Sequence, residues 1–407
     1  MRIAYLVGEY PRVSHAFIRR EVEGLRDRGV AVSTFSIRPA PTEELLTAAD
    51  RQAAAETWTI LPPQWGALAA AHMRASARSP VRYGSTLALA LRLSSGGVRA
   101  GLWQLFYFVE AIVLWDRLRS QRIKHVHAHF ANVATAVSLL VAHFGGEGWS
   151  WSFTMHGYTE FDDVTRYALA EKVRHARFVA CIGDYCRSQL MKLVEAEQWA
   201  KLEIVHCGID PSAYEVSDRY HNSGPLELLC VGRLVAEKGQ GVLLDALAAL
   251  RREGLYVRAT FAGDGPERAA LEHRAAQLGI AADVTFEGLV SQDRLRRLYA
   301  AADVFCLPSF AEGVPVVLME AMAAGLPVVS TRVMGIPELV EDGVSGELVP
   351  PGRPDSLAAA IRKLTAEPER RAAFGRAARV RVVAQYDVRT WVAVLHGLYV
   401  RYLGGTD

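Results

Sequence analysis

Two basic side chains lie five positions apart in a glycine-containing loop in the second half of the chain. This loop, residues 231–239, follows an apolar run and contains Arg233 and Lys238. A guanidinium makes forked contacts with phosphate oxygens, and an ammonium acts as a point charge. The pair is therefore suited to one diphosphate, and two ordinary exposed cations are the alternative.

Two glutamates eight positions apart form a second group. Glu312 stands just before a helical run over residues 316–324, and Glu320 lies one to two turns inside it, with Pro315 and Gly325 at the helix ends. The free N–H groups of the helix amino terminus suit phosphate oxygens. Carboxylates beside a phosphate are repulsive unless they face hydroxyls, so the arrangement favours a sugar nucleotide over a bare phosphate.

A tight turn at residues 262–267 contains Gly263 and leads into another helix. Alone this turn is weak evidence for a ligand site, but its place in the predicted fold matches that of the other two loops. Each follows a short strand pattern, and ligands of open parallel sheets bind at the carboxyl ends of the strands. We therefore expect all three loops at one edge of one sheet.

Short β-branched runs alternate with longer helical patterns along most of the chain, which predicts parallel sheets covered by helices. The predicted strands are 3–7, 30–37, 125–127, 152–155, 178–182 and 203–206, then 226–231, 257–262, 284–286, 304–307 and 327–330. A helix opened by Ser14 is the clearest helix of the first half. The pattern occurs twice, so the expected fold class is α/β with two Rossmann-like domains.

A polar stretch interrupts this rhythm and divides the chain. The predicted parts are an amino-terminal acceptor domain 1–210, a linker 211–225, a donor domain 226–385 and a carboxyl-terminal helix 386–407. Apolar residues from Trp391 to Leu403 recur at helical spacing, and we expect this helix to cross back to the first domain.

Composition excludes several classes of protein. The 407 residues carry a formal net charge of +2, which argues against a nucleic-acid binder. The longest apolar stretch, 102–115, is shorter than a membrane span, so we expect none. The five scattered cysteines form no CxxC pair, which predicts buried thiols in a reducing cytoplasm rather than disulfides or a zinc site.

Residues 72–124 are unusually basic. They contain nine basic residues against two acidic ones, a local excess of seven, with Trp103, Phe106, Tyr107, Phe108 and Trp115 among them. Such helices suit an anionic membrane surface. The alternative is a solvated helix pair that packs its aromatics in the core.

The GRL-x-x-EKG loop, the GDGP turn, the ADVFCLPSFAEGVPVVLMEAMAAGLPVV block and the MGIPELVEDGVSGELVPPG segment resemble the retaining family-4 glycosyltransferases of GT-B fold. The resemblance covers nearly all of residues 226–383, and a weaker one links the chain to transferases of bacterial exopolysaccharide assembly. It implies two Rossmann-like domains facing across a cleft, a nucleotide-diphosphate sugar as donor, transfer with retention, no cofactor and no metal.

The resemblance also assigns roles to residues. Arg233 and Lys238 would hold the donor diphosphate, Glu312 the transferred sugar and Glu320 the ribose. His156, in Thr154-Met155-His156-Gly157, would lie beside the sugar; a buried structural histidine is the alternative. Gly263, Gly313, Val314 and Leu289 complete the predicted donor site. Gly8, Tyr10, His129 and Asp163 are the predicted acceptor or cleft residues, with helix capping as the alternative for Asp163.

Two departures from the family pattern stand out. Met334 precedes Gly335 where many relatives have a second glycine, and the loop after the first strand lacks their glycine pair.

His125, His127 and His129 alternate along a predicted strand. We expect that they do not all share one face, which disfavours a three-histidine metal site.

The sequence thus predicts a cytoplasmic hexosyltransferase, peripheral on the inner face of the plasma membrane, that extends a glycan on a lipid-linked acceptor. Two alternatives stay open: a transferase with a soluble acceptor, and a non-catalytic partner subunit of the same fold. A partner subunit has no need to keep Arg233, Lys238, Glu312 and Glu320 together.

Overall fold

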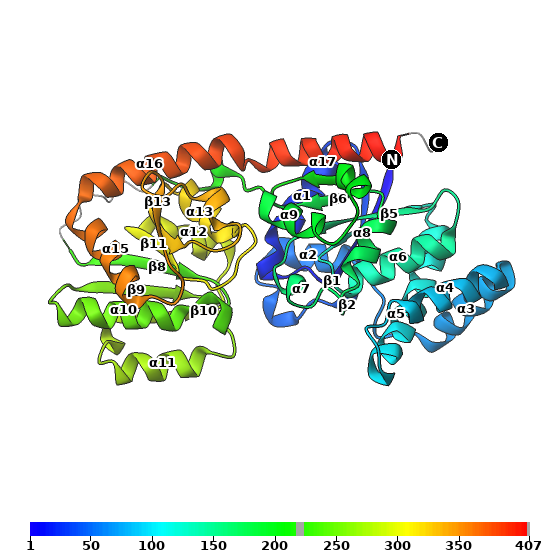
Figure 1. Cartoon of the computed structure of the whole chain (residues 1–407), viewed down its shortest axis with the longest axis horizontal. Helices are drawn as coiled ribbons and strands as arrows, with labels where there is room; N and C mark the ends of the chain where they lie inside the picture. Colours follow the sequence, from blue (N-terminus) through cyan, green and yellow to red (C-terminus); the bar gives the residue numbers. More distant parts are fainter. Residues whose placement is uncertain (217–223, 405–407) are drawn as a thin grey trace. The chain divides into compact units, whose positions relative to one another are not determined.

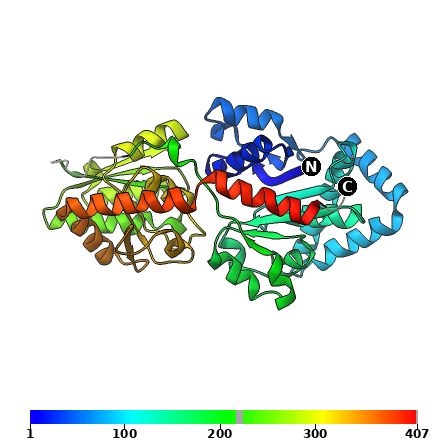
Figure 2. The same ribbon diagram turned by 90° about the horizontal axis from the view of Figure 1, so that it is seen from above.

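The computed structural model describes residues 1–216 and 224–404 and divides into two compact units. The first comprises Met1–His206 with Trp391–Asp407, and the second Cys207–Thr390. The predicted linker 211–225 lies after this boundary, in the second unit, and its residues 217–223 are outside the described residues. Figures 1 and 2 show the units as separate sheets with their helices.

The first unit contains a seven-stranded parallel sheet of order β3-β2-β1-β4-β5-β6-β7. Its strands are β1 (Arg2–Tyr10), β2 (Ala31–Pro39), β3 (Trp58–Thr59), β4 (His125–His129), β5 (Ser150–Met155), β6 (Val179–Cys181) and β7 (Leu202–Ile204). Its helices are α1 (Ala16–Asp27), α2 (Ala48–Glu56), α3 (Trp65–Arg78), α4 (Pro80–Arg92), α5 (Val98–Ser120), α6 (Val133–Gly145), α7 (Thr159–Asp162), α8 (Leu169–His175) and α9 (Asp184–Met191). All six predicted strands are present, and the two-residue β3 was not predicted.

The second unit contains a six-stranded parallel sheet of order β10-β9-β8-β11-β12-β13. Its strands are β8 (Leu226–Val231), β9 (Val257–Ala262), β10 (Val284–Gly288), β11 (Val304–Leu307), β12 (Val328–Thr331) and β13 (Gly346–Val349). Its helices are α10 (Gln240–Arg252), α11 (Arg268–Gln277), α12 (Gln292–Ala301), α13 (Val316–Ala323), α14 (Ile336–Leu339), α15 (Pro354–Ala366) and α16 (Pro368–Gln385). The five predicted strands are confirmed, and β13 was missed.

The last helix, α17 (Val388–Leu403), starts in the second unit and packs on the first from Trp391 onward. Its Tyr399 is fully buried, and the Tyr399 hydroxyl lies 3.1 Å from that of Tyr5 on β1. Figure 2 shows α17 lying along the strands of the first unit. The prediction that the carboxyl-terminal helix crosses back is confirmed.

Two local expectations need correction. Ser14 does not open a helix directly, because Val13–His15 form a 3-10 turn and α1 begins at Ala16 with no side-chain cap. The apolar stretch near residue 102 is part of α5, whose 23 residues are long and apolar enough, by length and composition, to cross a membrane. One such helix is weak evidence for a span, and the inner face of α5 packs against α6.

The five cysteines are all buried and free, as predicted.

Candidate functional site

The first two loops of the second unit pack against each other by backbone contacts. Gly232 N–H donates to Ala262 O at 3.0 Å, and Leu234 N–H donates to Asp264 O at 3.0 Å. A Cβ atom at Gly263 would lie 2.0 Å from Gly232 O, so this approach requires glycine. The interlocked backbones fix the position from which Arg233 extends.

The end of β10 joins the same edge of the sheet. Gly263 N–H donates to Gly288 O at 2.9 Å, one residue before Leu289, which we predicted to be part of the donor site. Leu289 follows with 43% of its surface exposed, while the Arg294 guanidinium donates to Glu287 at 2.5 Å. The exposed Leu289 side chain therefore offers an apolar contact surface at this edge of the sheet.

Lys238 and Glu312 form an ion pair with each other. Lys238 Nζ donates to Glu312 Oε1 at 2.5 Å, and Ser309 Oγ donates to the same oxygen at 2.8 Å. The Glu312 side chain is 6% exposed and that of Lys238 19%. Nothing in the sequence indicated this pairing, which compensates the charge of a carboxylate that we predicted to face sugar hydroxyls.

Arg233 differs from Lys238 in its surroundings. Its side chain is exposed and makes no hydrogen bond or ion pair with any residue in the described ranges 1–216 and 224–404. Its backbone oxygen accepts hydrogen bonds from Val235 N–H at 3.0 Å and from the Gln240 side-chain amide at 2.9 Å. The guanidinium is thus available for a ligand without breaking a protein contact.

Glu320 lies in the second turn of α13 and is 2% exposed. The hydroxyl of Tyr299, on α12, lies 3.2 Å from Glu320 Oε2 and 3.2 Å from Val317 O. Tyr299 orients this carboxylate, and sequence reasoning missed it because its position looked like ordinary helix core.

The loop after β12 contacts the Glu312 loop. Gly335 N–H lies 3.4 Å from Glu312 O, and a Cβ at Gly335 would be 2.1 Å from Gly313 O. Met334 has φ of 44°, the left-handed conformation that glycine adopts most easily. Glycine adopts this conformation without strain, which explains why many relatives have glycine at this position. Val314 beside it is buried.

In the first unit, His125, His127 and His129 are all buried on β4. The expectation that they do not share a face was wrong, because residues two apart on a strand point to the same side. Tyr399 packs on both His125 and His127, with ring centroids 5.9 and 5.6 Å apart, and the His127 and His129 rings are 5.1 Å apart.

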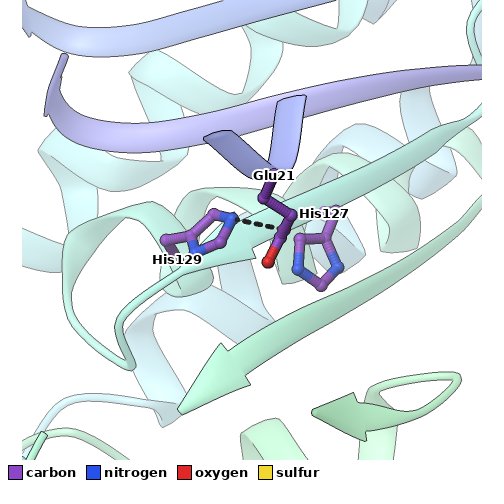
Figure 3. A group of neighbouring side chains, drawn as sticks. All are labelled: Glu21, His127 and His129. Carbon is purple, nitrogen blue, oxygen red and sulfur yellow. Dashed lines mark ion pairs between the residues drawn. The ribbon is translucent and has the colours of Figure 1, made fainter. Parts of the chain in front are cut away.

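Glu21, on α1, lies beside His127 and His129, and their nearest ligating atoms are within 4.8 Å of one another (Figure 3). Both His127 nitrogens are already hydrogen-bonded, to Ser152 Oγ at 2.8 Å and to Thr154 Oγ1 at 2.9 Å. A metal ion would have to break these bonds, so the cluster fits a hydrogen-bonded network better than a metal site.

His156 follows β5 and is 9% exposed. Its Nε2 lies 2.8 Å from His129 Nδ1, and its ring packs against Phe17 and Phe130 with centroids 4.7 and 4.8 Å apart. Burial, followed by the neighbouring imidazoles of His129 and His15, holds the pKa of His156 well below its usual range. The structure thus provides a neutral imidazole at the end of this strand.

The other predicted acceptor residues are dispersed. Tyr10 is 3% exposed, and burial raises the pKa of its phenol, so it belongs to the core rather than to a binding surface. His129 is fully buried behind His156. Asp163 is exposed and accepts a hydrogen bond from Arg166 N–H at 2.9 Å, which caps a turn. A Cβ at Gly8 would meet no atom within 4 Å, so that position is open.

An unpredicted network holds the loop after β1. Arg12 pairs with Glu9 at 2.8 Å and with Glu44, and Glu44 also accepts from Val13 N–H at 3.2 Å. Nothing in the sequence linked residue 44 to this loop.

Comparison with protein families finds a match within the second unit. The family described as "Glycosyl transferases group 1" matches residues 216–381. Amylovoran biosynthesis glycosyltransferase AmsK of Erwinia amylovora is 39% identical over 171 residues, which are 40% of this chain and 42% of that protein. The chain thus spans less than half the length of that relative.

Other relatives match over more of their length. A GDP-mannose-dependent alpha-(1-6)-phosphatidylinositol monomannoside mannosyltransferase of Mycobacterium tuberculosis is 31% identical, over 65% of this chain and 70% of that protein. The putative colanic acid biosynthesis glycosyltransferase WcaL of Salmonella typhimurium is 26% identical, over 90% and 91%.

Among solved structures, Anabaena Alr3699/HepE in complex with UDP and glucose has a TM-score of 0.75 at 20% identity and covers 98% of this chain and 99% of its own. At that identity the likeness establishes the fold, which is GT-B.

Proposed function

Because the chain belongs to the glycosyl transferases group 1 family, we propose that it transfers a hexosyl group from a nucleotide-diphosphate sugar to an acceptor hydroxyl, with retention of anomeric configuration. The main support is the grouping of Arg233, Lys238 and Glu312 with the amino terminus of α13 at one edge of one sheet. Relatives and structural neighbours whose names include GDP-mannose or UDP and glucose agree with such a donor.

The residues take complementary roles in this proposal. Arg233 and Lys238, with N–H groups near Gly313 and Val314, stabilise charge that develops on the leaving diphosphate. Glu312 accepts hydrogen bonds from the transferred sugar, and Glu320 from the ribose. These fixed charges supply what a divalent metal supplies in other transferases, so the proposed reaction needs neither metal nor cofactor.

We assign to His156 the role of accepting a hydrogen bond from a sugar hydroxyl, since burial keeps its pKa well below the usual range and an uncharged imidazole can accept one.

A panel of nucleotide sugars tests the donor assignment. Binding of the correct donor raises the melting temperature in proportion to the logarithm of its concentration over its dissociation constant. We expect one sugar nucleotide to stabilise the protein and to be consumed when acceptor is added. Stabilisation without turnover on lipid-linked and soluble glycan acceptors would favour the non-catalytic partner subunit instead.

For the acceptor, we propose a lipid-linked glycan in exopolysaccharide assembly at the inner face of the plasma membrane. The names of AmsK and WcaL, which refer to amylovoran and colanic acid, support this assignment. The basic segment 72–124 would hold the first unit against anionic lipid.

The outer face of the amino-terminal half of α5 fits such a surface. Five large apolar side chains are exposed there: Val98, Leu102, Trp103, Leu105 and Phe106, with exposed fractions of 42% to 83%. All five lie in the amino-terminal half of the helix, whereas Phe108 and Trp115, farther along it, are buried. Exposed apolar groups of this size on one helix mark an interaction surface.

Charge favours an anionic bilayer as the occupant. Arg99, near the start of α5, and Arg92, the last residue of α4, are both exposed, whereas the two acidic residues of the segment are withdrawn from solvent or paired. Glu110 is 7% exposed, and Asp116 accepts from Arg74 at 2.7 Å. Each free cation near an anionic surface contributes about 1 kcal/mol.

Vesicle flotation separates the two contributions. Arg92→Glu with Arg99→Glu should weaken binding to anionic vesicles mainly at low salt, because charges are screened over about 8 Å at physiological ionic strength. Trp103→Ser with Phe106→Ser should weaken binding at any salt. If the protein ignores anionic vesicles at low salt, the face binds protein or a second copy, and a soluble acceptor is favoured.

A further inference from the structure

Three aromatic side chains meet at the carboxyl edge of the first sheet. Phe17 lies in the first turn of α1, just past the loop after β1, while Phe130 and His156 directly follow β4 and β5. These three strands are neighbours in the order β1-β4-β5. The His156 ring centroid lies 4.7 Å from that of Phe17 and 4.8 Å from that of Phe130, and the two phenyl rings are 6.4 Å apart. Phe17 and Phe130 are both partly exposed, so this aromatic cluster is accessible from solvent.

The backbone of Phe130 has a conformation that bulky side chains rarely adopt. Its φ is 67°, in the left-handed region, where the Cβ atom crowds the following carbonyl oxygen. Phe130 N–H donates to Thr154 O on β5 at 3.0 Å, which ties the strained residue to the sheet. Strained backbone of this kind persists only where the surroundings over-determine it, and it is concentrated at functional sites.

Two buried charged side chains hold the loop immediately after Phe130. Glu160 Oε1 accepts from Ala131 N–H at 3.2 Å, and Lys172 Nζ donates to Ala131 O at 2.7 Å and to Asn132 O at 3.0 Å. Glu160 and Lys172 are each 3% exposed. Burial lowers the pKa of Lys172 to about 7, against the opposing effect of Glu160, because an ammonium is costly to take out of water. The fold thus uses two buried charged groups to fix one short loop.

Core packing alone does not account for this arrangement. Glycine or asparagine at position 130 would adopt the same φ with less strain, so the phenyl ring is what such a replacement would lose. Phe130 is only partly exposed, yet it buries less than Phe153 or Phe178, which are fully buried core residues. The role of the Phe130 ring therefore lies in the surface that it presents.

A pyranose ring matches that surface. One face of a pyranose consists largely of C–H groups, and stacking this face on an aromatic ring removes apolar surface from water. Its hydroxyls need polar partners nearby. The His15 ring, on the loop after β1, packs on Phe130 with centroids 4.9 Å apart, and the same loop carries Arg12, which pairs with Glu9. The side chains of Arg12 and Glu9 are each 29% exposed. A lipid chain would use the phenyl rings but not these charged groups.

We propose that Phe130 and Phe17 form a subsite that stacks on a pyranose ring of the acceptor glycan, with Glu160 and Lys172 as positioning residues that hold Phe130. The assignment to the acceptor rests on the proposed function, whereas binding of a pyranose at the aromatic cluster can be measured without turnover.

The binding test uses the full-length protein with ¹³C-labelled phenylalanine rings. Spectra of Phe130→Leu and Phe17→Leu each lack one ring signal and so assign these two residues. The probes are the methyl glycosides of glucose, galactose, mannose and glucuronic acid, added in large excess, with sorbitol as a control that has hydroxyls but no ring. We expect at least one glycoside to shift the Phe130 and Phe17 signals, and sorbitol to shift neither.

Kinetics separate a binding role from a structural one, with an acceptor that supports turnover in the assay of the proposed function. Phe130→Leu keeps an apolar side chain but loses the flat ring. The KM for acceptor should therefore rise about tenfold, with the KM for donor changed by less than about threefold. Phe144→Leu, the same change at the far end of α6, is the matched control. Because Phe144 is 3% exposed, this variant should lose stability without a change in the KM for acceptor.

Lys172→Met tests the positioning role. This substitution removes the donor to Ala131 O and Asn132 O but no aromatic ring. We expect the KM for acceptor to rise and the Phe130 ring signal to move. If both stay as in the wild type, Lys172 does not position Phe130 and that part of the proposal fails. If the variant does not fold, Phe130→Leu and the wild-type spectra still decide the subsite.

The outcomes separate the subsite from the proposed function. The subsite is overturned if no glycoside shifts the Phe130 and Phe17 signals, or if sorbitol shifts them equally, even when turnover is observed. A rise in the KM for donor rather than for acceptor in Phe130→Leu would overturn the assignment to the acceptor. If a glycoside shifts both signals but no sugar nucleotide is turned over, the subsite stands and the proposed function fails.

Discussion

Because Lys238 is paired with Glu312, substitutions of the two cations that we assign to the diphosphate should differ in their effect on the stability of the fold. Lys238 is bound to a buried carboxylate, whereas Arg233 has no side-chain partner in the described part of the chain. Lys238→Met therefore leaves Glu312 with the Ser309 hydroxyl as its side-chain partner in the described part of the chain, while Arg233→Met breaks no side-chain contact there. Both variants should lose activity, but only the first should lose stability.

The structure sets the size of the effect. At 2.5 Å and an effective dielectric constant of about 20, the attraction between two unit charges is about 7 kcal/mol, and desolvation offsets most of it. Removing one partner of a buried pair costs about 3–5 kcal/mol. Since Lys238 is 19% exposed and Ser309 still donates to Glu312, we expect Lys238→Met to cost about 2–3 kcal/mol. Arg233→Met should stay within about 0.5 kcal/mol of wild type.

Denaturant unfolding measures this difference, and the chain offers an internal control. All eight tryptophans lie in the first unit, so their fluorescence follows that unit, whereas far-ultraviolet circular dichroism follows both. We expect Lys238→Met to lower the dichroism midpoint. Lys238→Met combined with Glu312→Gln removes both charges and should recover most of the stability without recovering activity. Each single cation variant should lower kcat/KM by about 10²–10³.

Two results would refute this reasoning. Equal stability of Lys238→Met and Arg233→Met would mean that the pair does not hold Glu312 in solution. Turnover near wild type in both would remove the diphosphate assignment, whatever the stability.

Three further predictions follow from single observations. Activity should survive EDTA, because the proposed site uses fixed cations; loss on chelation that magnesium or manganese restores would contradict it. Met334→Gly should raise the free energy of unfolding by about 0.5–1 kcal/mol by relieving a left-handed φ, and a lower unfolding midpoint would contradict the strain. Burial raises the pKa of Glu110 to about 7, so the folded state retains a proton that the unfolded state loses, and this contribution to stability falls as pH rises from about 4.5 to 7. Glu110→Gln should therefore be more stable than wild type by about 2–3 kcal/mol at pH 8 but not at pH 4, and parallel pH curves would exclude the effect.

The sequence predicts the regular parts of the fold well, because β-branched runs and helical periodicity are local signals. The strands that were missed are β3 and β13, with two and four residues. In β13, Gly346 and Glu347 weaken the apolar signal, and its place is set by pairing with β12 through four residue pairs. Pairing between distant segments cannot be read from either segment alone.

The candidate site was predictable by residue type but not by contact. Arg233, Lys238, Glu312 and Glu320 stand out through their spacing, yet nothing in that spacing says that Lys238 and Glu312 bind each other. Tyr299 was hidden among core positions for the same reason. The sequence correctly indicated that His125, His127 and His129 lie on one strand. The prediction that they do not share a face was wrong, because side chains two residues apart on a strand point to the same side.

The ion pair also bears on how the site would distinguish an intact donor from a nucleoside diphosphate. In the proposed complex, Lys238 turns to the diphosphate and Glu312 loses its cation, which is costly for a carboxylate that is 6% exposed unless new donors replace it. The hydroxyls of the transferred sugar provide those donors, whereas a nucleoside diphosphate provides none. Glu312→Gln removes the charge, so the ratio of affinities for sugar nucleotide and nucleoside diphosphate should fall in that variant. Calorimetric titration of wild type and variant with both ligands measures it, and an unchanged ratio would mean that Glu312 does not face the sugar.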